Sequence, residues 1–151
     1  AVLFSLSCQV GAEESNCRQN TIRYLRKFGY DFGMAFQITD DLLDFSGDQN
    51  QVGKPLCSDF MEGVYTLPVI YTLQDAPYKD KMAKYIGRQD LTGGEIKEVG
   101  RLVEESGGLE KSRRLALRYL ERCHNSLAQL PDNKAKGAMM ELLEELIERR
   151  Y

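Results

Sequence analysis

The chain has 151 residues, of which 42% are hydrophobic, so it can build one hydrophobic core, and its length predicts a single unit covering residues 1–151. Its 20 basic and 23 acidic side chains give a net charge of −3 without a basic block, which excludes nucleic acid as an expected partner. Four cysteines without a C-x-x-C spacing and one histidine exclude a tetrahedral zinc site and indicate reduced thiols, as in a cytoplasmic protein.

The first segment, residues 1–12, is expected to be an apolar helix that begins without a capping residue. Ala1 leads directly into Val-Leu-Phe, with no Ser, Thr, Asp or Asn before it, as if the chain were entered within a helix. The run is too short to cross a bilayer and lacks the basic start of a signal peptide, so we expect no transmembrane segment. We therefore expect the chain to be a fragment of a larger protein.

A long helix is expected to follow the polar turn at residues 13–16 and to extend to about Phe45. Mostly apolar residues recur at every third or fourth position of this segment, the spacing that places them on one buried face of a helix. These positions are Ile22, Leu25, Phe28, Phe32, Phe36, Thr39 and Leu43. Gly29 and Gly33 each lower helix propensity by about 1 kcal/mol, so we expect a neighbouring helix or a ligand to approach closely there.

Three carboxylates, Asp40, Asp41 and Asp44, lie within about one turn near the end of this helix. Like charges at this spacing repel one another, so they need either water and salt to screen them or a cation to neutralise them. Carboxylates without a nearby histidine or thiolate select a hard cation, which favours Mg²⁺ bridged to phosphates, with Mn²⁺ as an alternative. An ordinary solvated acidic helix face is the competing interpretation.

Side chains near the acidic triplet are suited to complete a site for a metal and a phosphate. Gln37 lies three residues before Asp40, on the same side of the helix, and Phe36 lies one turn before it. Lys54 follows in the polar loop after the helix and can supply a positive charge to a phosphate, while Asp59 can coordinate a cation through water. Taken alone, Lys54 is better explained as a surface lysine.

The rest of the chain also carries helical periodicity, which predicts an all-α fold. Pro68 is tolerated in the first turn of a helix that ends before Asp75, and a short helix is expected over residues 79–86. Thr92 and Glu95 have the spacing of a capping box, which marks the start of the next helix.

Two further helices are expected, over residues 109–130 and after the Pro-Asp-Asn turn at residues 131–133. Each places its apolar residues on one face. The first carries four arginines that we expect to form a solvated face, because Glu110 and Glu121 lie among them. They are Arg113, Arg114, Arg118 and Arg122.

Read together, the motif around the acidic triplet resembles the second aspartate-rich region of the trans-isoprenyl (polyprenyl) diphosphate synthases. The matching residues are Gly33, Phe36, Gln37, Asp40, Asp41, Asp44, Gly53, Lys54, Pro55, Asp59, Gly63, Thr66, Leu67 and Pro68. The whole chain is similar, more weakly, to the C-terminal half of that family, and most like the large subunit of bacterial heptaprenyl diphosphate synthases. The resemblance implies the isoprenoid synthase helical bundle, of which this all-α chain would be the C-terminal portion.

The resemblance also implies a chemistry, in which an allylic diphosphate ionises with help from Mg²⁺ and condenses with isopentenyl diphosphate to a longer all-trans polyprenyl diphosphate. It assigns metal binding to Asp40, Asp41 and Asp44, with Asp40, Asp41 and Lys54 as catalytic residues. Substrate contacts are implied for Phe36, Gln37, Lys54 and Asp59.

The chain departs from the family pattern in ways that limit what it can do alone. Val64 stands where many relatives carry a lysine, and the first aspartate-rich motif is not among the 151 residues. We therefore expect this chain alone to be inactive, and we expect a homodimer, another homo-oligomer or a complex with a partner subunit. A non-catalytic helical subunit that binds a partner chain is the competing hypothesis. A di-iron carboxylate bundle is disfavoured because it needs Glu-x-x-His pairs and His124 is the single histidine.

Overall fold

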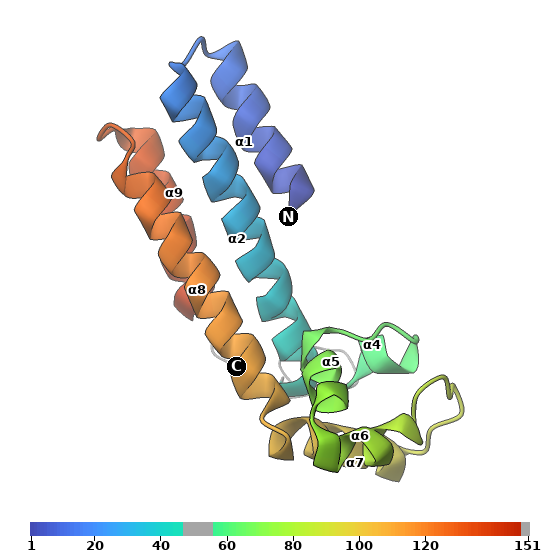
Figure 1. Ribbon diagram of the computed structural model, residues 1–151. Coiled ribbons are helices and arrows are strands. Elements are labelled where there is room, and N and C mark those ends of the chain that lie inside the picture. Colours follow the sequence, from blue (N-terminus) through green and yellow to red (C-terminus); the bar gives the residue numbers. More distant parts are fainter. Residues whose placement is uncertain (47–55, 149–151) are drawn as a thin grey trace. The chain divides into compact units, whose positions relative to one another are not determined.

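The computed structural model describes residues 1–46 and 56–148, and every regular element within them is an α-helix (Figure 1). The helices are α1 (Val2–Glu14), α2 (Gln19–Ser46), α4 (Ser58–Met61), α5 (Leu67–Gln74), α6 (Ala76–Ala83), α7 (Gly93–Glu105), α8 (Gly108–Ala128) and α9 (Lys134–Glu148). The all-α prediction is confirmed. The chain divides into two compact units, residues 1–39 with 115–148 and residues 40–46 with 56–114. Of the helices described, none is both long and apolar enough to cross a membrane.

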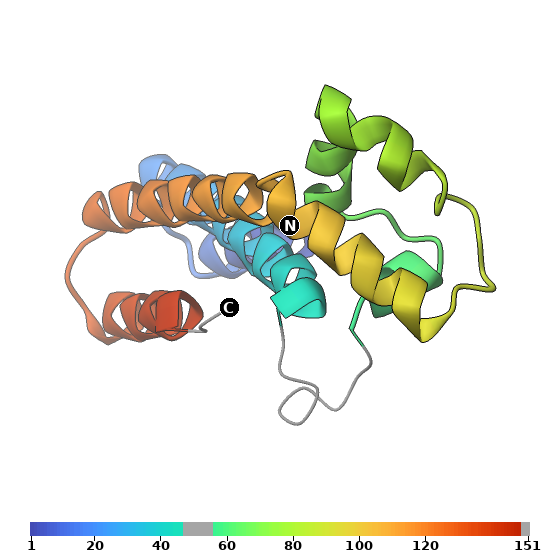
Figure 2. The same ribbon diagram turned by 90° about the horizontal axis from the view of Figure 1, so that it is seen from below.

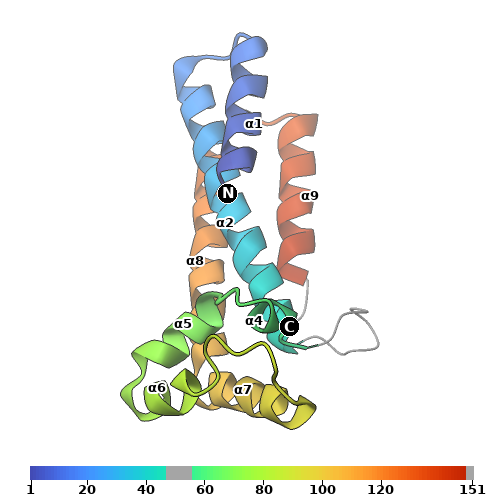
Figure 3. The same cartoon turned by 90° about the vertical axis from the view of Figure 1, so that its right-hand side faces the viewer.

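In the first unit, α1 lies along α2, and two glycines of α2 make this close approach possible (Figure 3). A Cβ atom at Gly29 would lie 2.5 Å from the carbonyl oxygen of Phe4, and one at Gly33 would lie 2.6 Å from the Cα atom of Ala1. The ring of Phe4 then packs edge-on against Phe32, with ring centroids 5.5 Å apart. The prediction that a neighbouring helix approaches these glycines is confirmed.

The core of the first unit is formed by apolar side chains of α2, α8 and α9 and by Leu130, which follows α8. Its buried members are Phe28, Ala35, Leu120, Cys123, Leu127, Leu130, Leu143 and Leu146. Full burial of one leucine side chain contributes about 1.5–3 kcal/mol. This burial holds the C-terminal helices against α2, and it follows the helical periodicity of all three segments.

In the second unit, the short helices α5 and α6 contact each other and α7 (Figure 2). Their buried side chains and those of α4 form a second core, with members Cys57, Phe60, Val69, Met82, Val99, Leu102 and Val103. The hydroxyl groups of Thr72 and Ser106 share a buried hydrogen bond of 2.8 Å, which ties α5 to the end of α7. Gly107 follows in the left-handed region, with φ +70°, and this conformation allows the chain to turn directly into α8.

The predicted start of α7 is confirmed, whereas the predicted start of α6 is wrong. The Thr92 hydroxyl accepts a hydrogen bond from the Glu95 amide, and the Glu95 carboxylate accepts one from the Thr92 amide. Helix α6 runs over Ala76–Ala83 rather than residues 79–86, with Pro77 in its first turn. A proline fits there because the first turn has no carbonyl partner for its missing N–H.

Candidate functional site

Helix α2 carries five of the residues predicted to form the site. Because α2 is continuous over Gln19–Ser46, Phe36, Asp40 and Asp44 follow one another at intervals of one turn. Gln37 and Asp40 are exposed, Asp41 is 9% exposed, and Phe36 and Asp44 are half-buried. The acidic triplet therefore has the register on one helix that its spacing predicts.

The carboxylate of Asp44 accepts hydrogen bonds from the residues that open helix α4. Its Oδ1 accepts from the Ser58 amide at 3.0 Å and from the Ser58 hydroxyl at 2.7 Å. Its Oδ2 accepts from the Asp59 amide at 3.3 Å. The Cys57 amide also donates to the backbone oxygen of Asp44 at 2.8 Å. Asp44 therefore acts as the N-terminal cap of α4, a helix too short to form without such a partner.

Helix α4 is an element that the sequence did not reveal, because its own N-cap position is Cys57, which makes no side-chain cap hydrogen bond. Cys57 adopts the left-handed region, with φ 59° and ψ 34°. The capping group comes from Asp44 on α2, so no local sequence signature announces the helix. Sequence patterns that mark the start of a helix use only neighbouring residues, so they cannot identify a capping carboxylate that is distant in the sequence.

Asp59, on α4, shares one electrostatic environment with the acidic triplet. Partial burial raises the pKa of its carboxyl group, and the negative charges of Asp44, Asp41 and Asp40 raise it further. A like charge nearby disfavours ionisation. The Asp59 amide lies 3.3 Å from Oδ2 of Asp44, so Asp59 belongs to the same acidic cluster as the triplet. A cation in this cluster would relieve that repulsion, which is the condition under which carboxylates bind metal.

The donor set suits a hard cation that is shared with a substrate. Within residues 1–46 and 56–148, no group of three or more His, Cys, Asp or Glu side chains is placed to hold a metal ion by itself. Mg²⁺ is commonly bound by one or two carboxylates together with waters and substrate phosphates, rather than by a cage of protein groups. Asp40 is exposed and offers carboxylate oxygens of that kind, whereas three hydrogen bonds already occupy much of the acceptor capacity of Asp44.

Phe36 belongs to an aromatic group of the first unit. Its ring centroid lies 5.8 Å from that of Phe4, and the two rings are tilted by 46°. Phe4 in turn contacts Phe32, which stacks on Phe28 at 5.7 Å. Packing against aromatic rings of its own unit therefore fixes the half-buried ring of Phe36, and a side chain that lines a pocket requires such a fixed position.

Lys54 lies outside the described residues, as do its neighbours Gly53 and Pro55. Its role in binding a phosphate stays a prediction. The hydroxyl of Thr66, which begins the Thr-Leu-Pro segment of the motif, is buried and has no hydrogen-bond partner among the residues that the structure describes.

The structure brings together a pair of residues that sequence analysis missed. Asp31 on α2 is 0% exposed, and its Oδ1 lies 2.9 Å from a guanidinium nitrogen of Arg122 on α8. Arg122 therefore does not belong to a purely solvated face, because one of its nitrogens compensates a buried carboxylate. The signal for Asp31 was present in the sequence, since a lone carboxylate between Phe28 and Ala35 interrupts the apolar stripe of α2.

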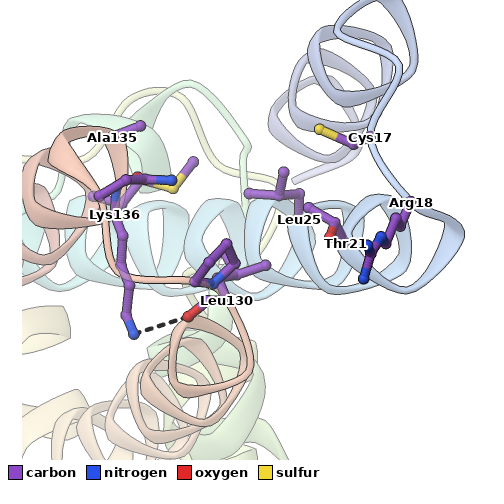
Figure 4. A pocket seen from close by; sticks show the side chains of 10 residues that line it. Cys17, Arg18, Thr21, Leu25, Leu130, Ala135 and Lys136 are labelled. Carbon is purple, nitrogen blue, oxygen red and sulfur yellow. Dashed lines mark hydrogen bonds between the residues drawn. The ribbon is translucent and has the colours of Figure 1, made fainter.

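An apolar cavity of about 300 Å³ lies in the first unit, where Leu25, Leu130 and Ala135 line it (Figure 4). Lys136, at its wall, donates from Nζ to the carbonyl oxygen of Leu130 at 3.0 Å and to the carboxylate of Asp132 at 2.7 Å. Because the lysine charge is compensated, the cavity offers mainly hydrocarbon surface. None of the predicted site residues lines it.

Comparison with known proteins identifies relatives of the whole chain. The family model for polyprenyl synthetase matches residues 1–103. Heptaprenyl diphosphate synthase component 2 of Geobacillus stearothermophilus is 37% identical over 151 residues, which are 100% of this chain and 47% of that protein. The structure of heptaprenyl diphosphate synthase from Staphylococcus aureus superposes with a TM-score of 0.85 at 31% identity, over 95% of this chain and 45% of that one.

A polyprenyl synthase from Caulobacter crescentus CB15, solved with calcium and isoprenyl diphosphate, superposes with a TM-score of 0.85 at 30% identity, over 99% of this chain and 46% of that one. The chain thus spans about half the length of the relatives that it matches. Its helices correspond to about half of an isoprenoid synthase fold.

Proposed function

The chain belongs to the polyprenyl synthetase family, and we propose on that basis that it is the C-terminal part of a trans-prenyltransferase. The reaction would join an allylic diphosphate to isopentenyl diphosphate and give a longer all-trans polyprenyl diphosphate. The observation that carries the proposal is the placement of Asp40, Asp41 and Asp44 within about one turn of the continuous helix α2, where Asp44 accepts a hydrogen bond from the Asp59 amide at 3.3 Å.

In this proposal the carboxylates of Asp40 and Asp41, with Asp44 beside them, hold Mg²⁺ or Mn²⁺. When bound, the cation would stabilise the negative charge that develops on the departing diphosphate. Gln37 and Lys54 would donate hydrogen bonds to that diphosphate and orient it. As the allylic carbon–oxygen bond breaks, the double bond of isopentenyl diphosphate would form the new carbon–carbon bond, and the released diphosphate would accept the proton that the resulting cation loses.

The hydrogen bonds of Asp44 refine the roles within the triplet. Because the two oxygens of Asp44 already accept from Ser58 and Asp59, we propose that the exposed Asp40 supplies more of the cation affinity than Asp44 does. Asp44 would keep α4 in place and thereby hold Asp59 where its carboxylate faces the cluster. Phe36, packed on Phe4, would form a fixed apolar wall for the allylic chain.

Direct metal binding tests the proposal without requiring catalysis. Paramagnetic Mn²⁺, added with inorganic diphosphate, should bind the wild-type chain, and Asp40→Asn and Asp41→Asn should each weaken binding at least about tenfold. Asp80→Asn is the matched control, because Asp80 is an exposed carboxylate of the same unit. Wild-type affinity in both Asp40→Asn and Asp41→Asn would refute the assignment of the site.

We also propose that residues 1–151 form one helical unit of a larger prenyltransferase domain and do not catalyse condensation by themselves. The resemblance implies that a second carboxylate cluster completes the site, and that cluster is not among these residues. Product formation by the purified chain with Mg²⁺, allylic diphosphate and isopentenyl diphosphate would contradict this. A cytoplasmic location and a homodimer stay predictions.

A non-catalytic subunit that associates with another chain is the second candidate, and one observation favours it. Val2 and Leu3 on α1 are each 74% exposed, and Leu6 is 54% exposed, so one face of α1 presents apolar side chains to solvent. Such faces drive association. Sedimentation velocity should show concentration-dependent self-association of the chain, whereas a monomer at all concentrations would count against this candidate.

A further inference from the structure

A basic cavity of about 330 Å³ lies in the first unit, with walls from α1, α2 and α8. Its charged lining consists of one acidic residue, Asp31, and four basic ones. The basic residues are Arg23, Arg26, Lys27 and Arg122. The wall therefore carries a clear excess of positive charge, and it shares no residue with the carboxylates proposed to bind a cation.

Three of these cations crowd one face of α2. Arg26 and Lys27 lie three and four residues after Arg23, the spacing at which like charges on a helix destabilise it. Within residues 1–46 and 56–148, no carboxylate forms an ion pair with any of the three. Arg23 lies over the ring of Tyr24, with its guanidinium carbon 5.1 Å from the centroid. Asp31 lines the same cavity and interacts electrostatically with Lys27, but one carboxylate cannot balance the four cations of the lining, so an excess of positive charge remains.

The fourth cation, Arg122, is held in place from two sides. Its guanidinium forms an ion pair with Asp31 at 2.9 Å, and its carbon lies 5.1 Å from the ring centroid of Tyr119. The Asp31 contact is an ion pair rather than an aligned hydrogen bond, and the carboxylate is fully buried. Because Arg122 keeps 49% of its side chain exposed, other N–H donors of the fork stay accessible to a ligand. Because Arg122 is already held in place, less conformational entropy of its side chain is lost when a ligand binds.

We propose that this cavity binds a phosphate anion without a metal ion. Guanidinium groups match the oxygens of phosphate with paired hydrogen bonds, and lysine adds a compact positive charge. A divalent anion gains more from several converging cations than a monovalent one does. The concave shape and small volume favour a phosphate group over a flat membrane surface. In this site Asp31 is a positioning residue, because it acts through Arg122.

Calorimetric titration with inorganic phosphate, in the presence of EDTA and with chloride at matched ionic strength as reference, tests the proposal. The wild-type chain should bind one phosphate saturably, and Arg26→Gln should weaken binding at least about tenfold, since a hydrogen bond to a charged group is lost. The control is Arg114→Gln, because Arg114 lies on α8, is 71% exposed and does not line the cavity. Absence of saturable binding, or an equal loss in the control, would overturn the proposal.

Two further arms keep the test decisive. Because Arg122→Gln alone would leave a buried carboxylate unpaired, the double variant Asp31→Asn/Arg122→Gln is used, and it should fold but lose phosphate binding. Titration with diphosphate distinguishes the source of the anion, since tighter binding than phosphate assigns the site to a diphosphate and equal binding assigns it to a single phosphate group. Binding to anionic lipid vesicles without binding to phosphate would overturn the proposal in favour of a membrane contact.

Discussion

Asp44 holds Ser58 by two hydrogen bonds, 3.0 Å from the Ser58 amide and 2.7 Å from its hydroxyl, both to the same carboxylate oxygen. The two residues are 14 positions apart, so this contact joins the acidic end of α2 to the start of α4. The third aspartate of the motif thus has a structural role of its own. A mutation at Asp44 would therefore change stability as well as any cation affinity, whereas the exposed Asp40 can be tested more cleanly.

Removal of the Ser58 hydroxyl should lower stability, because a hydrogen bond to an ionised acceptor is lost. Ser58→Ala is expected to reduce the free energy of unfolding by about 1–2 kcal/mol, measured by urea denaturation. Ser7→Ala is the control, since the exposed Ser7 hydroxyl bonds only to the Leu3 carbonyl of its own helix, and it should change stability by less than about 0.5 kcal/mol. Equal changes in the free energy of unfolding for the two variants would show that the hydrogen bond from the Ser58 hydroxyl to Asp44 stabilises the chain no more than an ordinary surface hydrogen bond.

Adding a methyl group at Gly29 should destabilise the packing of α1 on α2. Gly29→Ala would place a Cβ atom 2.5 Å from the Phe4 carbonyl oxygen, and overpacking of about 1–3 kcal/mol should exceed the helix-propensity gain of about 1 kcal/mol. Gly137→Ala on α9 is the matched control, because nothing lies within 4 Å of a Cβ atom there, and it should be neutral or stabilising. Chemical denaturation measures both, and a stabilised Gly29→Ala would contradict the packing described.

The capping box of α7 should make stability depend on acid pH. Hydrogen bonds from the Thr92 amide, Arg88 and the Thr92 hydroxyl lower the pKa of Glu95 to about 2 from its ordinary value of 4.5. Because the folded pKa is depressed, this stabilisation is present above about pH 4.5 and is lost as pH falls toward about 2. Glu95→Gln keeps an acceptor at this position but should flatten the dependence of thermal stability on pH in that window.

The exposed Gln129, which carries no ionisable group, provides the control for a surface substitution. Gln129→Ala should leave the pH profile of the melting temperature as in the wild type. If Glu95→Gln retained the wild-type slope between about pH 4.5 and 2, the charge of Glu95 would not be the source of the acid sensitivity.

The two buried thiols should resist alkylation while the chain is folded. Burial, with Asp44 nearby, raises the pKa of Cys57 to about 12, and burial, with Asp31 nearby, raises that of Cys123 to about 12. The thiolate is the reactive form, so iodoacetamide at neutral pH should modify the half-buried Cys17 first. Mass spectrometry of the digested protein should show Cys57 and Cys123 modified only in denaturant, and rapid labelling of either in the native chain would contradict their burial.

The sequence by itself determined the features whose geometry is local. The all-α fold, the stripe of α2, the register of Asp40, Asp41 and Asp44, and the capping box of Thr92 all depend on the fixed period of a helix or on neighbours within one turn. The glycines at positions 29 and 33 were also informative, because a poor helix former retained in a buried stripe indicates close packing.

The tertiary structure alone decided which distant residues meet. Asp44 caps α4 from another helix, Asp31 pairs with Arg122 across 91 positions of the sequence (122 minus 31), and four cations gather around one cavity. Periodicity assigns a residue to a face but not to a partner, since the partner depends on how two helices pack. For that reason the sequence predicts that Arg122 is a solvated arginine, whereas in the fold it forms an ion pair with the buried carboxylate of Asp31.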